Sequence, residues 1–155
     1  MPGVAAYESA FAKLEPALKA SGPAWLHDLR REGLERFKSL GFPSLKEEEW
    51  RFTRTRPIAE LDFVPAAAAP ALADAVITSR TFDDSSCRRL VLVNGALAPK
   101  LAQGPEWPKG VRAESLAEAM RRDGERIREL LARGARAENQ RFAALNTAFL
   151  NDGVL

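Results

Sequence analysis

The segment from Gly41 to Leu61 constrains the fold more than any other part of this chain. Gly41 is suited to end a preceding helix because glycine adopts positive φ without steric cost, and Pro43 keeps that helix from resuming. Ser44, followed three residues later by Glu47, forms a capping box, which is typical of a helix N-terminus. The segment therefore predicts a sharp turn between two helical elements.

The sequence before this turn predicts two amphipathic helices. Phe11, Leu14 and Leu18 share one face of the first helix, which Pro16 is expected to kink or shorten, and the chain restarts at residues 21–23. In the second helix, apolar or small residues recur at steps of three or four, with the arginines expected mostly on the opposite face. That apolar stripe consists of Leu26, Leu29, Gly33, Phe37 and Leu40, and the arginines include Arg30, Arg31 and Arg36.

The chain changes character after residue 64. Two prolines enclose four alanines over residues 65–70, which is typical of a linker. Residues 90–93 form a short β-favouring run, and Asn94-Gly95 predicts a type I′ turn into a return strand at 96–101. Pro99 restricts that return strand to a sheet edge, and we expect a third short strand at 111–113.

Helical periodicity returns after residue 114 and continues to Gly134, and a last helix carries Phe142, Leu145 and Phe149. Val154 and Leu155 then begin an apolar run, so we expect the start of a strand, a frayed C-terminal end and a truncated chain. The predicted fold is α+β and mainly helical. Its sections are helical residues 1–64, a linker at 65–70, a strand-bearing section at 71–113 and helices at 114–155.

Composition excludes several classes of protein. The 155 residues are 46% hydrophobic and 28% charged, which is ordinary for a globular domain. The net charge is only +2, from 23 basic and 21 acidic residues, so we expect no nucleic-acid and no membrane partner. The sequence has no apolar run of the ~20 residues that a membrane span needs, and charged residues interrupt residues 1–21 where a signal peptide would be apolar. We expect a cytoplasmic protein.

The residues that could carry chemistry do not form a recognisable site. Cys87 is the only cysteine and His27 the only histidine, which leaves no thiol pair and no catalytic pair by spacing. Glu47, Glu48 and Glu49 are consecutive, and side chains about 100° apart on a helix cannot converge on one ion. We therefore predict no catalytic, cofactor-binding or metal-ligating residue and no enzymatic activity.

Aromatic and basic residues alternate from Trp50 to Arg56 and admit two interpretations. Trp50 and Phe52 with the neighbouring arginines would suit stacking on single-stranded nucleic acid, but the adjacent glutamates neutralise the segment. We favour packing, with Trp50 buried against the second helix, Arg54 over its indole and Glu47 paired with Arg51.

Three segments together resemble the N-terminal region of the SufD family of iron-sulfur cluster assembly proteins. The first segment matches the family's Pro-x-x-Lys-x-Glu-x-Trp-Lys/Arg-Tyr-Thr run at Pro43, Lys46, Glu48 or Glu49, Trp50, Arg51 and Thr53, with Phe52 in place of the tyrosine. Residues 89–95 and 142–153 resemble two further segments of the family in the same order.

The resemblance implies a non-catalytic scaffold portion of a longer subunit of the SUF complex, with SufB-like and SufC-like partners. In the family a right-handed parallel β-helix and a helical C-terminal domain follow this region. Clusters and ATP are handled by other domains and subunits, so no cofactor is expected in this chain. The alternative is a stand-alone helical module that binds a protein partner and has no link to iron-sulfur chemistry.

Overall fold

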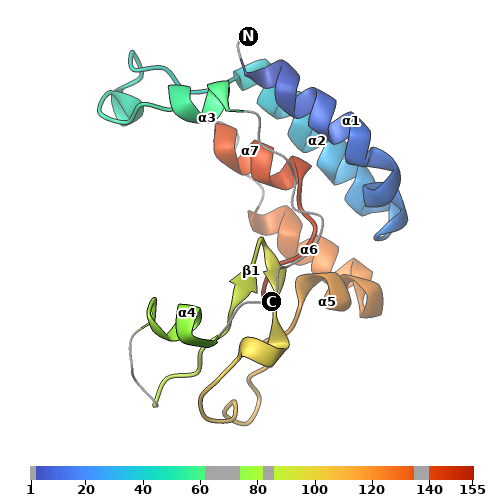
Figure 1. Cartoon of the computed structure of the whole chain (residues 1–155). Helices are drawn as coiled ribbons and strands as arrows, with labels where there is room; N and C mark the ends of the chain where they lie inside the picture. Colours follow the sequence, from blue (N-terminus) through green and yellow to red (C-terminus); the bar gives the residue numbers. More distant parts are fainter. Residues whose placement is uncertain (1–2, 62–73, 82–85, 135–139) are drawn as a thin grey trace. The chain divides into compact units, whose positions relative to one another are not determined.

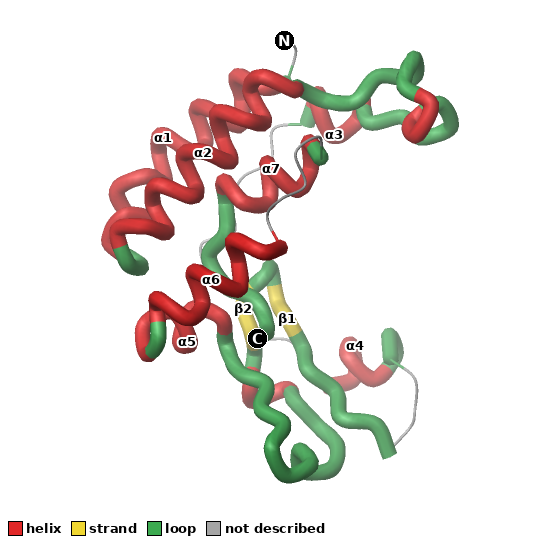
Figure 2. Tube along the Cα trace, turned by 180° about the vertical axis from the view of Figure 1, so that it is seen from behind, coloured by secondary structure: helices red, strands yellow, loops and turns green. Residues whose placement is uncertain are grey.

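The computed structural model describes residues 3–61, 74–81, 86–134 and 140–155 of the chain. These residues are mostly helical and include a two-stranded antiparallel sheet (Figures 1 and 2), which confirms the mainly helical prediction. Within these ranges no helix has the length and apolar character that a membrane crossing requires. The predicted linker at residues 65–70 lies outside the described residues.

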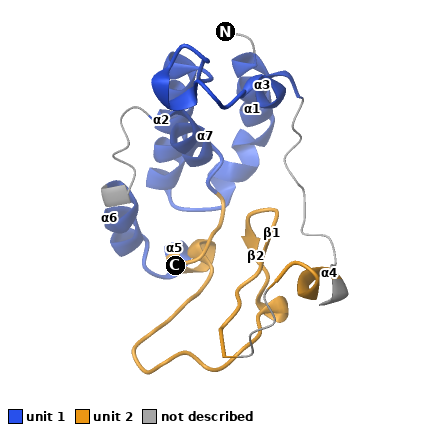
Figure 3. Cartoon of the chain, turned by 90° about the vertical axis from the view of Figure 1, so that its left-hand side faces the viewer, with its two compact units in different colours: residues 1–65, 120–150 blue, residues 66–119, 151–155 orange. Residues whose placement is uncertain are grey.

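The chain forms two compact units (Figure 3). Unit 1 comprises Met1–Pro65 and Met120–Leu150, and unit 2 comprises Ala66–Ala119 and Asn151–Leu155. Each unit therefore combines segments that are distant in the sequence.

Unit 1 is built on two long helices that lie side by side (Figure 1), α1 (Val4–Ala20) and α2 (Ala24–Leu40). The shorter α7 (Arg141–Ala148) packs against α2. The short α3 (Arg56–Glu60) and α6 (Gly124–Gly134) also belong to this unit. The helical sequence predicted between residues 114 and 134 is divided at Asp123, which separates α5 (Leu116–Arg122) from α6.

Helix α1 runs through Pro16, so the expected shortening at this residue is wrong. A proline inside a helix removes one backbone hydrogen bond. Phe11 and Leu18 are buried on either side of Pro16, and their packing holds the helix together to Ala20.

The buried face of α2 follows the predicted stripe at Leu26, Gly33 and Phe37, whereas Leu29 and Leu40 are only partly buried. Gly33 is needed because α7 approaches closely at this point. A Cβ atom here would lie 2.8 Å from the backbone nitrogen of Ala148 and 2.9 Å from the carbonyl oxygen of Ala144. The small residues of α7 and the missing side chain of Gly33 together allow this contact.

Arg30 is buried in the same face of α2, with only 1% of its surface exposed. Its Nη1 donates to the carbonyl oxygen of Leu18 at 2.6 Å, and its Nε donates to that of Leu150 at 2.7 Å. The side chain thus ties the end of α1 and the residues after α7 to α2. Burial lowers the pKa of this guanidinium by desolvation. The expectation that the arginines of this helix lie mostly on its exposed side is wrong for Arg30.

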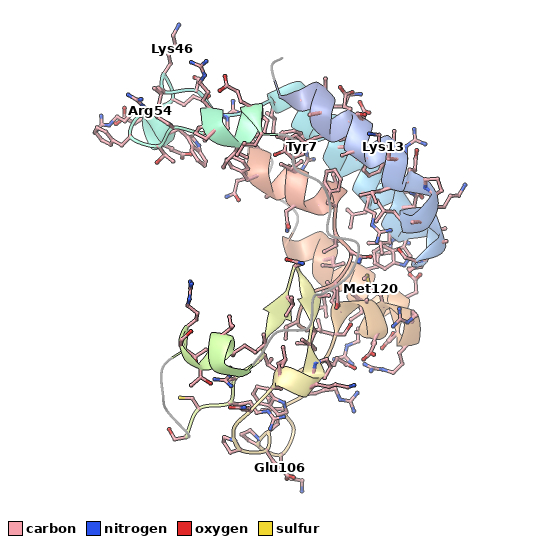
Figure 4. All side chains as sticks on the ribbon, in the orientation of Figure 1. Tyr7, Lys13, Lys46, Arg54, Glu106 and Met120 are labelled. Carbon is pink, nitrogen blue, oxygen red and sulfur yellow. The ribbon has the colours of Figure 1, made fainter. Side chains whose placement is uncertain are left out.

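Aromatic rings fill the space between α1, α2 and the residues that flank α7. Tyr7 lies 5.8 Å from Phe37 and 6.4 Å from Phe149 between ring centroids, and Phe37 lies 5.1 Å from Phe42 (Tyr7 is labelled in Figure 4). The T-shaped geometry of these three pairs is favourable for rings with a negative face and a positive edge. This cluster is the core beneath the turn that follows α2.

Unit 2 contains the predicted hairpin, formed by β1 (Leu92–Val93) and β2 (Ala96–Leu97). Asn94 and Gly95 have positive φ values of 51° and 84°, as a type I′ turn requires. The strands are shorter than predicted, because Pro99 begins a 3₁₀ turn, η2 (Pro99–Leu101), instead of sitting on the return strand. Another short helix of this unit is α4 (Asp74–Thr78).

The end of the chain in unit 2 is paired, which corrects two predictions. Val154 forms an antiparallel bridge with Ser115, and Glu114 and Leu155 exchange backbone hydrogen bonds of 3.1 and 3.0 Å. The expected strand at 111–113 is absent from the described structure, since the pairing begins one residue later. Val154 and Leu155 do start extended pairing, but the expectation that they lack a partner and fray is wrong.

Asp152 holds this arrangement together. Its carboxylate accepts hydrogen bonds from the backbone N–H groups of Leu97 and Ala117, each at 3.0 Å, and from the Ser115 hydroxyl at 2.8 Å. Burial on its own would raise the pKa of this carboxyl, but the hydrogen bonds, led by that from Ala117, outweigh burial and hold the pKa below its ordinary value. Asp152 therefore connects the hairpin, the start of α5 and the last residues of the chain.

Candidate functional site

The residues that carried the strongest sequence signal form a loop, residues 44–54, that follows α2 in unit 1. Gly41 ends α2 as predicted, with a φ of 64° and its N–H donated to the carbonyl oxygen of Phe37 at 2.7 Å. The predicted helix after Ser44 is only a 3₁₀ turn, η1 (Glu48–Trp50). The capping prediction is half right, because the Glu47 carboxylate accepts the Ser44 N–H at 2.8 Å but no side chain caps the turn itself.

The base of the 44–54 loop is closed by a buried hydrogen bond. The Thr55 hydroxyl donates to the carbonyl oxygen of Pro43 at 2.9 Å, and both residues are buried. Inside the loop, backbone N–H groups of Glu47, Trp50 and Thr53 donate to carbonyl oxygens three residues earlier. These hydrogen bonds therefore hold the backbone of the loop in a defined conformation.

Glu47 anchors the loop to α7. Its carboxylate forms a close ion pair with Arg141, and the Nε of Arg141 also donates to the carbonyl oxygen of Leu40 at 3.0 Å. The backbone hydrogen bond from Ser44 is the main cause that lowers the pKa of Glu47, and Arg141 lowers it further. The sequence prediction paired Glu47 with Arg51, which is wrong: Arg51 pairs with Glu48 at 2.6 Å.

Trp50 packs against α7. Its ring lies 5.3 Å from that of Phe142, and its side chain is only partly buried. The prediction of a fully buried indole under Arg54 is therefore wrong in burial and partner. Among the described residues, the cation–π contacts are Arg51 over Phe52, 4.6 Å to the ring centroid, and Arg88 over Trp107.

Nine residues of the loop are exposed: Ser44, Leu45, Lys46, Glu48, Glu49, Arg51, Phe52, Thr53 and Arg54. We call four of them, Leu45, Lys46, Phe52 and Arg54, the tip surface. Phe52 is 86% exposed, although it is a large apolar ring. A pocket of about 560 Å³ next to the tip surface is lined by Leu45 and Arg54 together with Phe42 and residues of α3. Figure 4 shows Lys46 and Arg54 extending from the loop.

The remaining candidate groups are His27, Cys87 and the loop glutamates. His27 lies on α2 near Glu15, with 3.4 Å between Nε2 and the carboxylate, and Cys87 is exposed in unit 2. Glu47 and Glu48 point to different arginines, and so they do not converge. In the described ranges, no group of three or more His, Cys, Asp and Glu residues is placed to hold a metal ion.

Sequence reasoning missed Arg141 and Asp152, which organise the two units. Both residues bind backbone groups that are distant in the sequence, so no local spacing of residue types predicts these contacts. Arg30 did carry a signal, since it lies four residues after Leu26 and three before Gly33, within the buried stripe.

Comparison with known proteins identifies the family. The family model described as the SufBD protein N-terminal region matches residues 1–155. The chain therefore belongs to the SufB/SufD type of iron-sulfur cluster assembly proteins, as their N-terminal region.

One curated relative is an iron-sulfur cluster assembly SufBD family protein of Synechocystis sp., which is 28% identical over 117 residues. The match covers 76% of this chain and 25% of that protein, so the chain corresponds to about a quarter of its relative. No solved structure matches the chain.

Proposed function

We propose that this chain is the N-terminal scaffold portion of a SufD-like subunit of the cytoplasmic SUF complex and takes part in iron-sulfur cluster assembly without catalysing a step. The family match over residues 1–155 is the observation that carries the proposal. The three segments that resemble the SufD family favour this member of the SufB/SufD type. Cluster building and its energy supply then belong to the rest of the subunit and to SufB-like and SufC-like partners.

The uses of the charged side chains support a structural role. The best-connected charged groups, Arg30, Arg141, Glu47 and Asp152, hold segments of this chain together. An iron-sulfur cluster usually takes four thiolate ligands, or thiolates with histidines, and the sequence supplies one cysteine and one histidine. This supports a scaffold that leaves cluster ligation to other parts of the assembly.

Anaerobic reconstitution of residues 1–155 with iron and sulfide tests the non-catalytic part of the proposal. We expect no stoichiometric cluster absorbance, and Cys87→Ser should behave like the parent chain. A stoichiometric cluster that disappears in Cys87→Ser would contradict the scaffold role.

Co-purification tests membership of the complex. The tagged full-length protein, expressed from its natural gene, should isolate with its SufB-like and SufC-like subunits in fixed ratio. If neither subunit accompanies it, the stand-alone interaction module becomes the better account of the chain.

A further inference from the structure

A short segment of unit 2, residues 111–113, carries backbone groups that have no partner within the described structure. The N–H of Val111 donates to the carbonyl oxygen of Pro108 at 3.0 Å, so a turn ends immediately before the segment. Neither Arg112 nor Ala113 forms a backbone hydrogen bond within the described ranges. Open N–H and C=O groups of this kind form an edge to which another strand can add.

The pairing at the end of the chain sets the register of such a strand. Glu114 and Leu155 exchange two backbone hydrogen bonds, of 3.1 and 3.0 Å, in an antiparallel arrangement. In antiparallel ladders, hydrogen-bonded pairs alternate with pairs that are not hydrogen-bonded. A strand that continued beyond Leu155 would therefore place its first residue opposite Ala113. Its second residue would form the next hydrogen-bonded pair, with Arg112, and its third would lie opposite Val111.

The side chains of the segment fit this register. Arg112 and Glu114 lie on one face, with 4.0 Å between Nη1 and the carboxylate, and a shared face at a spacing of two residues is typical of an extended chain. Val111 and Val154, which are 51% and 40% exposed, belong to the opposite face. The first and third residues of a continuing strand would lie on this apolar face, so we expect both of them to be apolar.

The continuation of the same chain suits this edge better than a separate molecule does. Leu155 is already bound to Glu114, so the next residues reach the edge without a loop to close. The turn before Val111 limits the open edge to three residues and to one further hydrogen-bonded pair. A contact of this size is too small to offset the freedom that a separate partner loses on binding.

We propose that in the full-length protein the three residues that follow Leu155 form an antiparallel strand on residues 111–113, with the second of them hydrogen-bonded to Arg112. This inference rests on the proposed function, because it takes the chain as the N-terminal portion of a longer subunit. Unit 2 is then the part of this chain to which the rest of the subunit is anchored by backbone pairing.

Engineered disulfides in the full-length protein test the register. The matched variant combines Ala113→Cys with a cysteine at the first residue after Leu155, because directly opposite residues bring their Cβ atoms within disulfide range. The control combines Ala113→Cys with a cysteine at the second residue, whose side chain points to the other face. Both proteins carry Cys87→Ser. After mild oxidation, peptide mass spectrometry should detect at least about tenfold more intramolecular disulfide in the matched variant than in the control.

Three outcomes of this experiment overturn the proposal. A disulfide that forms equally well in the control would show another register. A disulfide that links two protein molecules would show that a second copy covers the edge. No disulfide in either variant would show that the continuing chain does not reach residues 111–113.

Amide hydrogen exchange at single-residue resolution tests the same pairing in the unmodified full-length protein. Arg112 should exchange at least about tenfold more slowly than Ala113, because neighbouring N–H groups of a strand point to opposite sides. Glu114, whose N–H is bound to Leu155, provides the protected reference. Exchange of Arg112 as fast as that of Ala113 would overturn the proposal even if the cysteine variants did not fold.

These measurements separate this inference from the proposed function. If the full-length protein isolates with its SufB-like and SufC-like subunits but Arg112 is unprotected, the strand pairing is wrong and complex membership stands. If Arg112 is protected and the matched disulfide forms but neither subunit accompanies the protein, the proposed function fails and the pairing stands.

Discussion

Removing the guanidinium of Arg30 should destabilise unit 1 more than any other single charge deletion in α2. We consider Arg30→Met, which keeps an apolar stem of similar length in the buried site. The carbonyl oxygens of Leu18 and Leu150 would lose donors at 2.6 and 2.7 Å, and the Ser21 hydroxyl would lose a weaker contact at 3.5 Å.

The magnitude follows from these lost partners. A buried acceptor left without its donor costs about 1–3 kcal/mol. This applies to the carbonyl oxygen of Leu150, because that of Leu18 keeps hydrogen bonds from the Ser21 hydroxyl at 2.9 Å and from the Ser21 N–H at 3.3 Å. The variant recovers part of this cost because it no longer buries a charge, whose desolvation is itself unfavourable. We therefore expect a net loss of about 1–3 kcal/mol in the free energy of unfolding.

Urea unfolding followed by circular dichroism measures this loss, with Arg31→Met as the matched control. Arg31 is the next residue on the same helix and is exposed, so its replacement should change the stability by less than about 0.5 kcal/mol. If Arg30→Met and Arg31→Met have the same midpoint, the buried arginine does not hold α1 and the end of α7 to α2.

Three further predictions use the same unfolding assay. Gly33→Ala should destabilise the chain by roughly 1–3 kcal/mol because its Cβ would meet the α7 backbone, although alanine normally stabilises a helix. The control Gly124→Ala, whose Cβ would have its nearest neighbouring atom at 3.6 Å, should be neutral or stabilising. A gain in stability for Gly33→Ala would refute the close contact. Asp152 has a lowered pKa in the folded state, so its contribution to stability is complete above its ordinary unfolded pKa and is lost as the pH falls through the lower folded value. Asp152→Asn should remove this part of the acid sensitivity, and an unchanged pH profile would show that the carboxylate does not act as described. Trp50→Ala should lower the free energy of unfolding by less than the roughly 3–5 kcal/mol typical of a fully buried ring, since the indole is only partly buried against Phe142. A loss within that range would instead support the fully buried indole that the sequence predicts.

Features that depend on local geometry were predictable from the sequence. Gly41 ends α2 and Asn94-Gly95 makes the hairpin turn because these residues satisfy backbone conformations that few others adopt. Amphipathic periodicity located α1 and α2, because apolar residues that recur every three or four positions define one helix face.

Features that depend on distant contacts were not predictable. Trp50 was placed against α2 because that helix is adjacent in sequence, but its partner Phe142 lies near the other end of the chain. Val154 gained a partner in Ser115, and Asp152 gained three donors from residues that are at least 35 positions away. A local pattern contains no information about such neighbours.

The candidate site was found by sequence, but its character was not. The segment with the strongest motif does form a defined loop. The prediction about aromatic packing in this loop, however, concerned Trp50. Phe52, which differs from the tyrosine of the resembling motif, is the exposed residue. Burial depends on the direction in which a turn presents its side chains, and composition does not determine this direction.

Genetic complementation tests the central claim most directly. A strain that lacks SufD is grown under iron limitation with residues 1–155 alone, with the full-length protein, or with the full-length protein lacking residues 1–155. The scaffold account predicts rescue by the full-length protein and failure of both partial proteins, because the N-terminal portion is required but supplies no cluster ligands. Rescue by residues 1–155 alone, or failure of the full-length protein, would contradict it.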